Sequence, residues 1–572
     1  MPNMEIIWVS PQKIILSYTN PDEFNDELKI GTYVKIPDQA SGNKEIIGIV
    51  SNYHIQYSEK IISVEDHQIS KSFIIEVDLL GMIESNNFVR WAHGITIPPQ
   101  DNVSIAKSQD LQKIYNVEKN KVFSFWNLSQ NTDDRVNIDW NKFFNKHFAI
   151  VWSTWSGKSH TVAKILQNAM NEKNEWDFTL NNSHIILFDI HGEYKDCFGE
   201  KANNIDITNL KLPYWLLNSE ELEDFFLDTK ESNAHNQISQ FVRWVTKNKQ
   251  LHNSSDPNIH FNSPVFFDIN EVFNYIRNLN FSTKEAKTWK LAIETREWEV
   301  DTDIENRLFK SDVVFKQKKN WEINAGQFAW EFDRFVIRFE NKLNDNRLNF
   351  ILGQEASLIS FQDAIKQFIW YNAQKNITVI DLSGIPSEVL NIVVSLISRL
   401  LFQYGYYHKK YLKEQQREIE VPLVLVYEEA HKYIPKTWWT KYRSVKESIE
   451  RIAKEGRKYG VTLGIISQRP SEISETIFSQ CNNFIAMRLT NPDDQNYIKR
   501  LLPDTLGNMI DILPLLSVWE WLIMGDSINM PSLIKVDPCD VKPNSNDVKY
   551  LEIWKEEWKN VDFEALEAVW KS

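Results

Sequence analysis

Cysteine and long apolar runs are both scarce in this sequence. Its 572 residues include three cysteines, far apart and in no metal-ligand spacing (Cys197, Cys481 and Cys539). They favour neither a disulfide framework nor a zinc site, so we expect a reducing, cytoplasmic environment. No apolar run reaches the ~18 residues that span a bilayer, and the first residues lack the basic and apolar segments of a secretory leader. Neither secretion nor a membrane partner is expected.

Uniform positive charge is also absent. The formal net charge is −14 and the pI is near 5.5, which excludes a surface that attracts nucleic acid everywhere. If the protein binds DNA, it must do so through a local surface, such as the lining of a channel. With 42% hydrophobic and 25% charged residues, the chain has the composition of a folded protein, and its length predicts roughly two or three domains.

Hydrophobic patterning divides the chain into four parts. Residues 1–105 contain short β-branched runs separated by turn residues, which predict a small β-barrel or sandwich that docks partners or assembles a ring. Residues 106–204 and 371–540 alternate buried strands with helices and predict an α/β core. Residues 205–370 have mainly helical patterns and are interpreted as an insertion. Residues 541–572 form an amphipathic tail that we expect to pack on the body or on a neighbouring subunit.

The predicted core contains short runs rich in valine and isoleucine. Continuous apolar runs of this length are typical of strands covered on both faces, so the sheet is expected to be mainly parallel. The predicted strands are HFAIV (147–151), IILFDI (185–190), ITVIDL (377–382), LVLVYE (423–428), TLGIIS (462–467) and NFIAMRL (483–489).

The first of these strands leads into a loop that ends Gly157-Lys158-Ser159 and then into a predicted helix. A strand, a tight loop and a helix in this order form the phosphate-binding P-loop, or Walker A motif. Backbone N–H groups at the helix start hold phosphate, Lys158 neutralises the outer phosphates and Ser159 ligates Mg²⁺. The motif predicts ATP and Mg²⁺ as cofactors, with nucleotide contacts from Ser156, Gly157, Lys158, Ser159 and His160.

Two tryptophans conflict with this motif. Trp152 and Trp155 stand where the motif carries glycine, whose missing side chain lets the backbone curl around phosphate. The whole chain has 17 glycines and 21 tryptophans, whereas glycine usually makes up ~7% of a protein. We hypothesise that some glycine codons have been read or recorded as tryptophan, since GGG and TGG differ by one base. The alternative is that the tryptophans are genuine and the site is crippled.

A second, acidic motif follows the strand at 423–428. Glu428 and Glu429 end this buried strand, as in a Walker B motif, where one acid orients the Mg²⁺ shell and the next activates the attacking water. We assign Glu428 to the metal and Glu429 to the general base. Gln468 ends the next strand and is a candidate sensor of the γ-phosphate or of water. Asp189 ends the strand IILFDI and is a candidate nucleotide contact.

The motifs GKS, FDIHGEY, VIDLSG, EEAH, RIAKEGRKYG and SQRPSEI occur in this order along the core. Together they resemble the HerA-like ATPases of the HerA and FtsK superfamily, which combine a RecA-like P-loop core with an N-terminal barrel. Relatives carry aspartate at the position of Glu428. The resemblance implies an ATP-driven translocase or helicase on duplex DNA and a hexameric ring. It also implies a nuclease or other effector enzyme on the barrel face, in DNA processing or antiviral defence.

The same resemblance implies that an arginine from a neighbouring subunit completes each nucleotide site. Arg451 and Arg457, within RIAKEGRKYG, are the candidates, because arginine stabilises charge on a transferring phosphoryl group. A solvated basic helix face is the alternative. For DNA, the loop after the acidic motif offers cations that can follow phosphates without reading sequence, or an ordinary exposed loop: Lys436, Lys441 and Arg443.

Two other functions fit the same residues. If the loop tryptophans are genuine, the ring is a scaffold that binds nucleotide poorly and organises an effector enzyme. A secretion or conjugation motor that moves another polymer is the remaining alternative.

Overall fold

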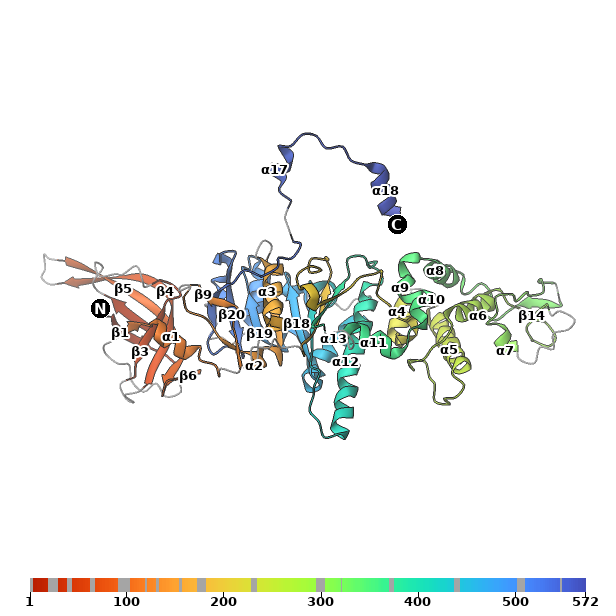
Figure 1. Ribbon diagram of the computed structural model, residues 1–572, viewed down its shortest axis with the longest axis horizontal. Coiled ribbons are helices and arrows are strands. Elements are labelled where there is room, and N and C mark those ends of the chain that lie inside the picture. The colour runs from red at the N-terminus through yellow and green to blue at the C-terminus, as the bar shows by residue number, and fades with distance from the viewer. Residues whose placement is uncertain are drawn as a thin grey trace.

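The computed structural model describes most of the chain. The described residues are 4–18, 29–38, 44–61, 67–90, 103–118, 121–129, 133–153, 157–171, 182–227, 234–294, 304–319, 321–369, 375–436, 443–501, 510–545 and 548–571. Figure 1 shows an elongated molecule with an N-terminal sheet at one end, a central α/β core and a helical insertion at the other end. Within the described residues, no helix combines the length and the apolarity needed to cross a bilayer.

The N-terminal part is an antiparallel sheet with a core of its own. Its order is β1 (Met4–Val9), β2 (Lys13–Tyr18), β5 (His67–Glu84), β4 (Lys44–Ile61), β3 (Tyr33–Pro37) and β7 (Ser104–Ile105), and β6 (Asn87–Arg90) pairs with β5. Its buried residues are alternating aliphatic side chains such as Ile14, Leu16, Val34 and Ile75, as expected for a half-buried sheet. The strands confirm an all-β module at this end, whereas closure into a barrel stays a prediction.

One arginine fastens this module to the core. At the end of β6, the Arg90 guanidinium donates to the backbone carbonyls of Asn529 (2.7 Å), Gly525 (2.5 Å) and Ile528 (2.5 Å). Burial lowers the pKa of Arg90. Three carbonyl acceptors satisfy most of the donor fork, so this side chain bridges the two parts of the chain.

The central sheet has ten strands. Its order is β13 (Ala202–Ile205), β16 (Ile377–Asp381), β12 (His184–Asp189), β17 (Leu423–Tyr427), β18 (Val461–Ser467), β11 (His147–Val151), β19 (Cys481–Ala486), β20 (Glu520–Gly525), β21 (Ser532–Val536) and β9 (Trp126–Leu128). The strands from β13 to β19 are parallel, and β20, β21 and β9 continue it antiparallel. All six predicted core strands are present, and the mainly parallel sheet is confirmed.

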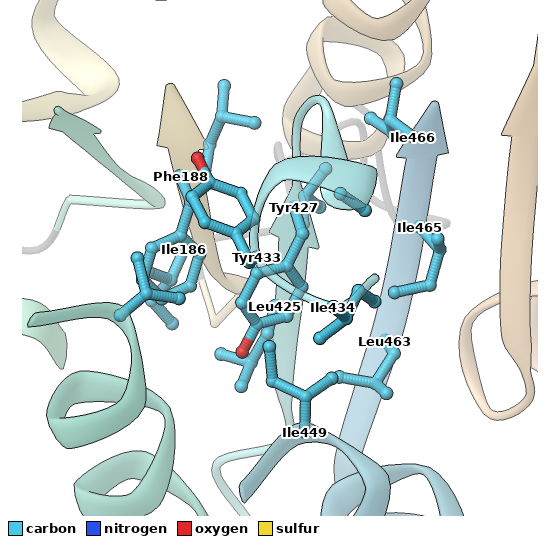
Figure 2. Packing of buried hydrophobic residues seen from close by; sticks show 14 of the residues in the cluster. Ile186, Phe188, Leu425, Tyr427, Tyr433, Ile434, Ile449, Leu463, Ile465 and Ile466 are labelled. Atoms are coloured by element: carbon cyan, nitrogen blue, oxygen red, sulfur yellow. The ribbon is translucent and has the colours of Figure 1, made fainter. Parts of the chain in front are cut away.

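Apolar side chains cover the middle of this sheet on both faces. Figure 2 shows Ile186, Leu425 and Leu463 with their neighbours on β12, β17 and β18, together with Ile449 from the helix α13 (Arg443–Glu455). The rings of Phe188 and Tyr427 stack with centroids 4.5 Å apart and planes 7° from parallel. This packing fixes the strand ends from which the polar site residues project.

The region between β13 and β16 is mainly helical, as predicted. It contains α4 (Ser219–Phe226), α5 (Ala234–His252), α6 (Ile269–Phe281), α8 (Asp333–Leu343) and α11 (Phe361–Ile369), with a small hairpin of β14 (Thr283–Glu285) and β15 (Ile323–Ala325). Buried Glu221 on α4 binds Arg399 of α12 (Leu390–Glu414) at 2.7 Å and accepts from Ser395 at 2.8 Å. A buried ion pair thus joins the insertion to the core.

The C-terminal tail contains α17 (Tyr550–Trp554) and α18 (Phe563–Lys571). Figure 1 shows it leaving the body, and its described side chains from 548 to 570 are exposed. The first residues of the tail lie on the core, where Gln167 Nε2 donates to Val541 O at 2.9 Å and Asn544 N donates to Glu193 O at 2.8 Å. Packing on a neighbouring subunit stays a prediction.

Candidate nucleotide site

The P-loop begins where β11 ends. The N–H and the hydroxyl of Ser153 both donate to the carbonyl of Arg488 at 2.8 Å, which ties the loop to the strand beside it. Gly157 has φ 74°, a left-handed conformation that glycine adopts without strain. The helix α3 (Lys158–Asn171) starts immediately afterwards. The strand, loop and helix therefore follow the predicted order; Ser156 and Trp155 lie outside the described residues.

Trp152 occupies the inner side of this loop. Its side chain is 3% exposed, and the Lys158 ammonium lies 5.1 Å from the centroid of its ring. A cation at this distance from an indole face is attracted to the ring electrons. The indole thus packs directly on the lysine that the motif assigns to phosphate.

The two acids of the second motif meet this lysine. Glu428 and Glu429 follow β17 and are 0% and 3% exposed. The Lys158 Nζ lies 2.7 Å from Glu428 Oε1 and 3.2 Å from Glu429 Oε1. The structure therefore brings Lys158, after the carboxyl end of β11, together with two acids at the end of β17 that are distant in sequence. This is the edge at which open α/β sheets bind ligands.

Burial and charge act against each other in this cluster. Burial raises the pKa of Glu428, and the nearby Lys158 opposes that rise without reversing it. Burial lowers the pKa of Lys158, but the two carboxylates outweigh it and the net shift is upward. The ammonium is therefore held as a cation by the acids it touches. Phosphate oxygens are the natural competitors for the same ammonium.

Glu429 has a strained backbone. Its φ and ψ are 48° and 46°, in the left-handed region that non-glycine residues seldom adopt. Such a conformation costs on the order of 1–3 kcal/mol and persists where the surroundings impose it, often at functional sites. Here it turns the chain from β17 into the short helix at Ala430–Lys432 while keeping the carboxylate next to Lys158.

The carboxylates retain free coordination capacity. Among the described residues, the Oε2 atoms of Glu428 and Glu429 are buried and have no hydrogen-bond partner. Buried carboxylate oxygens without donors are costly unless a cation or water satisfies them. The hydroxyl of Ser159 and the carboxylate of Glu428 are oxygen donors of the type that Mg²⁺ prefers. The residues present fit the predicted ion.

Glu193 is a site residue that the sequence motifs did not single out. Its carboxylate accepts a hydrogen bond from the Ser159 hydroxyl, and the next residue, Tyr194, donates from its buried hydroxyl to Glu428 at 3.3 Å. The available signal was its place four residues after the end of β12, because that turn lies at the same sheet edge as the P-loop.

The structure describes three further residues that the sequence predicts to contact the nucleotide or to sense its γ-phosphate. Asp189 is fully buried and accepts from the N–H groups of His191 (3.2 Å), Gly192 (2.9 Å) and Tyr194 (2.9 Å), so it shapes the turn that carries Glu193. Gln468 lies half-buried directly after β18, at the edge predicted for it. His160 lies on α3 with Nδ1 3.2 Å from Cys539 Sγ. Their roles toward nucleotide stay predictions.

The two candidate arginines lie elsewhere. Arg451 on α13 is exposed, with its guanidinium 5.0 Å from the Phe402 ring and 3.8 Å from Glu455. Arg457 is exposed in the turn that precedes β18. Because β11 and β18 are parallel, the start of β18 is at the opposite edge of the sheet from the P-loop. An arginine at that edge faces away from the nucleotide site of its own chain.

The candidate DNA loop is partly described. Lys436 pairs with Glu475 at 2.7 Å, and Arg443 pairs with Glu447 at 2.9 Å on α13. Both cations are on the surface. Lys441 lies outside the described residues.

Comparisons with known proteins agree with this site. Residues 127–324 match the family described as "Helicase HerA, central domain". A probable helicase of Methanocaldococcus jannaschii is 25% identical over 96% of this chain and 95% of its own length. The DNA double-strand break repair helicase HerA of Pyrococcus furiosus is 24% identical over 86% of this chain and 83% of its own length.

Solved structures give a coarser likeness. VirB4 of Thermoanaerobacter pseudethanolicus aligns over 74% of this chain and 98% of its own, with 13% identity and a TM-score of 0.43. The bacterial conjugative coupling protein TrwB aligns over 77% and 94%, with 10% identity and a TM-score of 0.44. The chain is therefore similar to HerA-type helicases along nearly its whole length, and it has a lysine and two acids together at the carboxyl edge of a mainly parallel sheet.

Proposed function

We propose that the protein uses ATP hydrolysis to move along duplex DNA, as a translocase or helicase motor. The observation that carries the proposal is the buried cluster of Lys158 with Glu428 and Glu429, whose Oε2 atoms accept no hydrogen bond from the described residues. The curated HerA relatives are named as DNA double-strand break repair helicases, which supports DNA as the polymer.

Each site residue has a role in hydrolysis. Lys158 exchanges its carboxylate partners for the outer phosphates when nucleotide binds. Glu429 then accepts a proton from the attacking water through Oε2, which accepts no hydrogen bond from the part of the chain that the structure describes and lies 3.4 Å from His431 Nδ1. Ser159 and Glu428 would hold Mg²⁺, which would neutralise charge on the phosphates. Gln468, at the end of the adjacent strand, orients the water or contacts the γ-phosphate.

The position of the arginines supports a ring. Arg451 and Arg457 lie toward the sheet edge that faces away from the P-loop of the same chain, so they contribute to hydrolysis only across a subunit interface. We propose a hexamer in which one of them completes the neighbour's site. Native mass measurement gives the ring size, and the exposed tail is a further candidate for contact between subunits.

An effector enzyme is proposed on the N-terminal sheet. The sheet stands at the end of the molecule away from the insertion, with Trp8, Ile55 and Val89 among its exposed apolar residues. A nuclease or another effector bound there would act on DNA that the ring moves, in DNA processing or antiviral defence. Deleting the N-terminal sheet should abolish binding of the effector enzyme and leave the nucleotide site of the core intact.

A scaffold that hydrolyses ATP poorly is the second candidate. It is favoured by Trp152, whose buried ring packs on Lys158 and takes space beside the phosphate lysine. The two functions differ in one measurement, which is the rate of ATP hydrolysis with and without duplex DNA. Stimulation by DNA supports the motor, and nucleotide-independent binding of an effector without turnover supports the scaffold.

The DNA loop provides a sharper test. Reversing its charges in a Lys436→Glu/Lys441→Glu/Arg443→Glu variant should remove DNA stimulation and spare basal hydrolysis, because these cations contact phosphate and lie outside the buried cluster. Arg417→Glu is the matched control, since Arg417 is a surface cation paired with Glu420 on another part of the core. Stimulation that survives the triple reversal would contradict the assignment of this loop.

A further inference from the structure

Three tryptophans adopt a backbone conformation that belongs to glycine. Trp289, Trp321 and Trp330 have φ angles of 60°, 69° and 68°. Among the described residues, they make up three of the seven non-glycine positions with positive φ, in a chain with 21 tryptophans among 572 residues. The left-handed region brings Cβ against the following carbonyl, and bulky residues avoid it. Glycine has no Cβ and adopts it freely.

Hydrogen bonds hold the backbone in this conformation at each position. Trp289 N donates to Glu285 O at 3.0 Å, and Trp330 N donates to Asn280 O at 3.0 Å. Trp321 lies within a turn that is closed by a bond from Ile323 N to Lys319 O at 2.9 Å. The local fold, and not the side chain, therefore sets the φ angle.

The side chains at these positions contribute little. The indoles are 72%, 92% and 66% exposed, in the order of the sequence. Trp289 has Lys284 4.1 Å above its ring, and Trp330 has an edge contact with Phe281 at 5.5 Å. Trp321 is the most exposed of the three. An exposed indole on a left-handed backbone is the reverse of what tryptophan usually does, since it is normally well buried.

Other tryptophans of the chain behave as tryptophan does elsewhere. Trp126, Trp215 and Trp244 are buried, and their indole N–H groups donate to Val136 O (2.9 Å), Ser357 O (2.9 Å) and Gln240 Oε1 (3.0 Å). These indoles fill the core and satisfy their donor. The chain thus contains two groups of tryptophan that differ in both exposure and backbone.

We group Trp152 with Trp289, Trp321 and Trp330 for a different reason, which is its place in the P-loop. It stands at the start of the P-loop, where a side chain competes with phosphate for space, and its ring lies 5.1 Å from Lys158. On the other side of the loop, a Cβ on Gly157 would approach the Trp519 ring to 3.3 Å. Indoles therefore lie against both the lysine and the glycine that the motif reserves for phosphate.

We propose that positions 152, 289, 321 and 330 are glycine positions, and that the polypeptide made in the cell carries glycine at them. The P-loop with glycine at 152 then has space for the phosphates beside Lys158. This last part rests on the proposed function, whereas the three positions in the insertion depend on backbone geometry alone.

Position 321 gives the cleanest test in recombinant protein. Trp321→Gly should raise the thermal unfolding midpoint of the insertion by about 2–4 °C, and Trp321→Ala should not, because alanine keeps the Cβ that the left-handed region disfavours. Trp558 is the control: it is 93% exposed and absent from the positive-φ positions, so glycine there should give no increase. Equal midpoints for the glycine and alanine variants at 321 would overturn the proposal.

Position 152 is tested by nucleotide binding. Titration of Mg-ATP into the Trp152→Gly/Trp155→Gly variant should show affinity on the order of tenfold higher, or more, than in the chain with both tryptophans. Unchanged affinity would remove position 152 from the proposal. If the variant binds ATP but hydrolyses none with or without DNA, the glycine assignment stands and the proposed motor function fails.

Peptide masses from the protein purified from its natural source give the direct answer. Peptides that cover positions 152, 289, 321 and 330 should have the mass of glycine, and those that cover 126, 215 and 244 should have the mass of tryptophan. Tryptophan masses at all seven positions would contradict the proposal, whatever the variants show.

Discussion

The nucleotide site has an acidic half, formed by Glu428 and Glu429, and a phosphate half, formed by the P-loop. The residues of the acidic half suit their predicted function better than those of the phosphate half. In the acidic half, Glu428 and Glu429 are buried at the end of β17 and both contact Lys158. In the phosphate half, the loop after β11 starts with a buried indole on the same lysine. Glu428 and Glu429 are positioned by β17, whereas the P-loop follows β11. The comparison teaches that the two acids can be in place even when the P-loop starts with a tryptophan, because each half depends on its own strand.

The largest expected effect is on hydrolysis. Glu429→Gln should lower the ATP turnover number by about 10²–10⁴-fold, because an amide cannot accept the proton from water. Binding of Mg-ATP should persist, as measured by titration, since Lys158 and the P-loop remain. Glu447→Gln, an exposed acid paired with Arg443, is the control and should hydrolyse at the unaltered rate. Full turnover in Glu429→Gln would remove this residue from the acidic half.

A second change tests how far the two halves depend on each other. Lys158→Met leaves buried Glu428 without its cation and should lower the free energy of unfolding by about 3–5 kcal/mol, as measured by denaturant titration. Lys158→Met/Glu428→Gln should recover part of that loss, because Glu429 is then the one buried acid of the cluster that lacks the ammonium. If the single and double variants unfold at the same denaturant concentration, the pair is not energetically coupled.

The third prediction concerns the other end of β11. Burial lowers the pKa of His147 to about 4 from 6.5, and its ring is held between Ala453 O at Nε2 (2.9 Å) and Leu463 N at Nδ1 (3.0 Å). The folded state therefore binds fewer protons than the unfolded state below pH 6.5. Stability is complete above this pH and falls by about 3 kcal/mol as the pH drops toward 4.

His147→Gln should flatten this pH dependence, because glutamine offers a donor and an acceptor without titrating. The measurement is the free energy of unfolding at several pH values. An unchanged slope between pH 6.5 and 4 in the variant would show that other groups dominate. ATP binding measured above pH 6.5 should be equal in the two proteins, because His147 is at the start of β11 and the P-loop follows its end.

Much of the core was predictable because its strands are buried on both faces. Continuous apolar runs marked β11, β12, β16, β17 and β18 to within one residue and overlapped β19, which begins and ends earlier than predicted. Strand ends then placed Lys158 beside Glu428 and Glu429. The antiparallel strands β20, β21 and β9, which continue the sheet beyond β19, were not predicted, since short strands with mixed composition have weak periodicity.

One residue of the site and the position of the tail could not be predicted from the sequence, for physical reasons. Glu193 belongs to it through a turn shaped by three N–H groups that donate to Asp189, and such a turn has no sequence period. The tail was expected to pack because it is amphipathic, yet pattern alone cannot say which surface an apolar face will cover. Contacts that depend on a neighbouring chain are beyond a single sequence.

The hydrogen bonds of Arg90 have a consequence for how the N-terminal sheet and the core can move. Its guanidinium donates to the carbonyl of Gly525 at the end of β20 and to two carbonyls in the segment that leads to β21, so the N-terminal sheet is attached to that border of the core. A tilt of that border of the core would therefore move the N-terminal sheet with it.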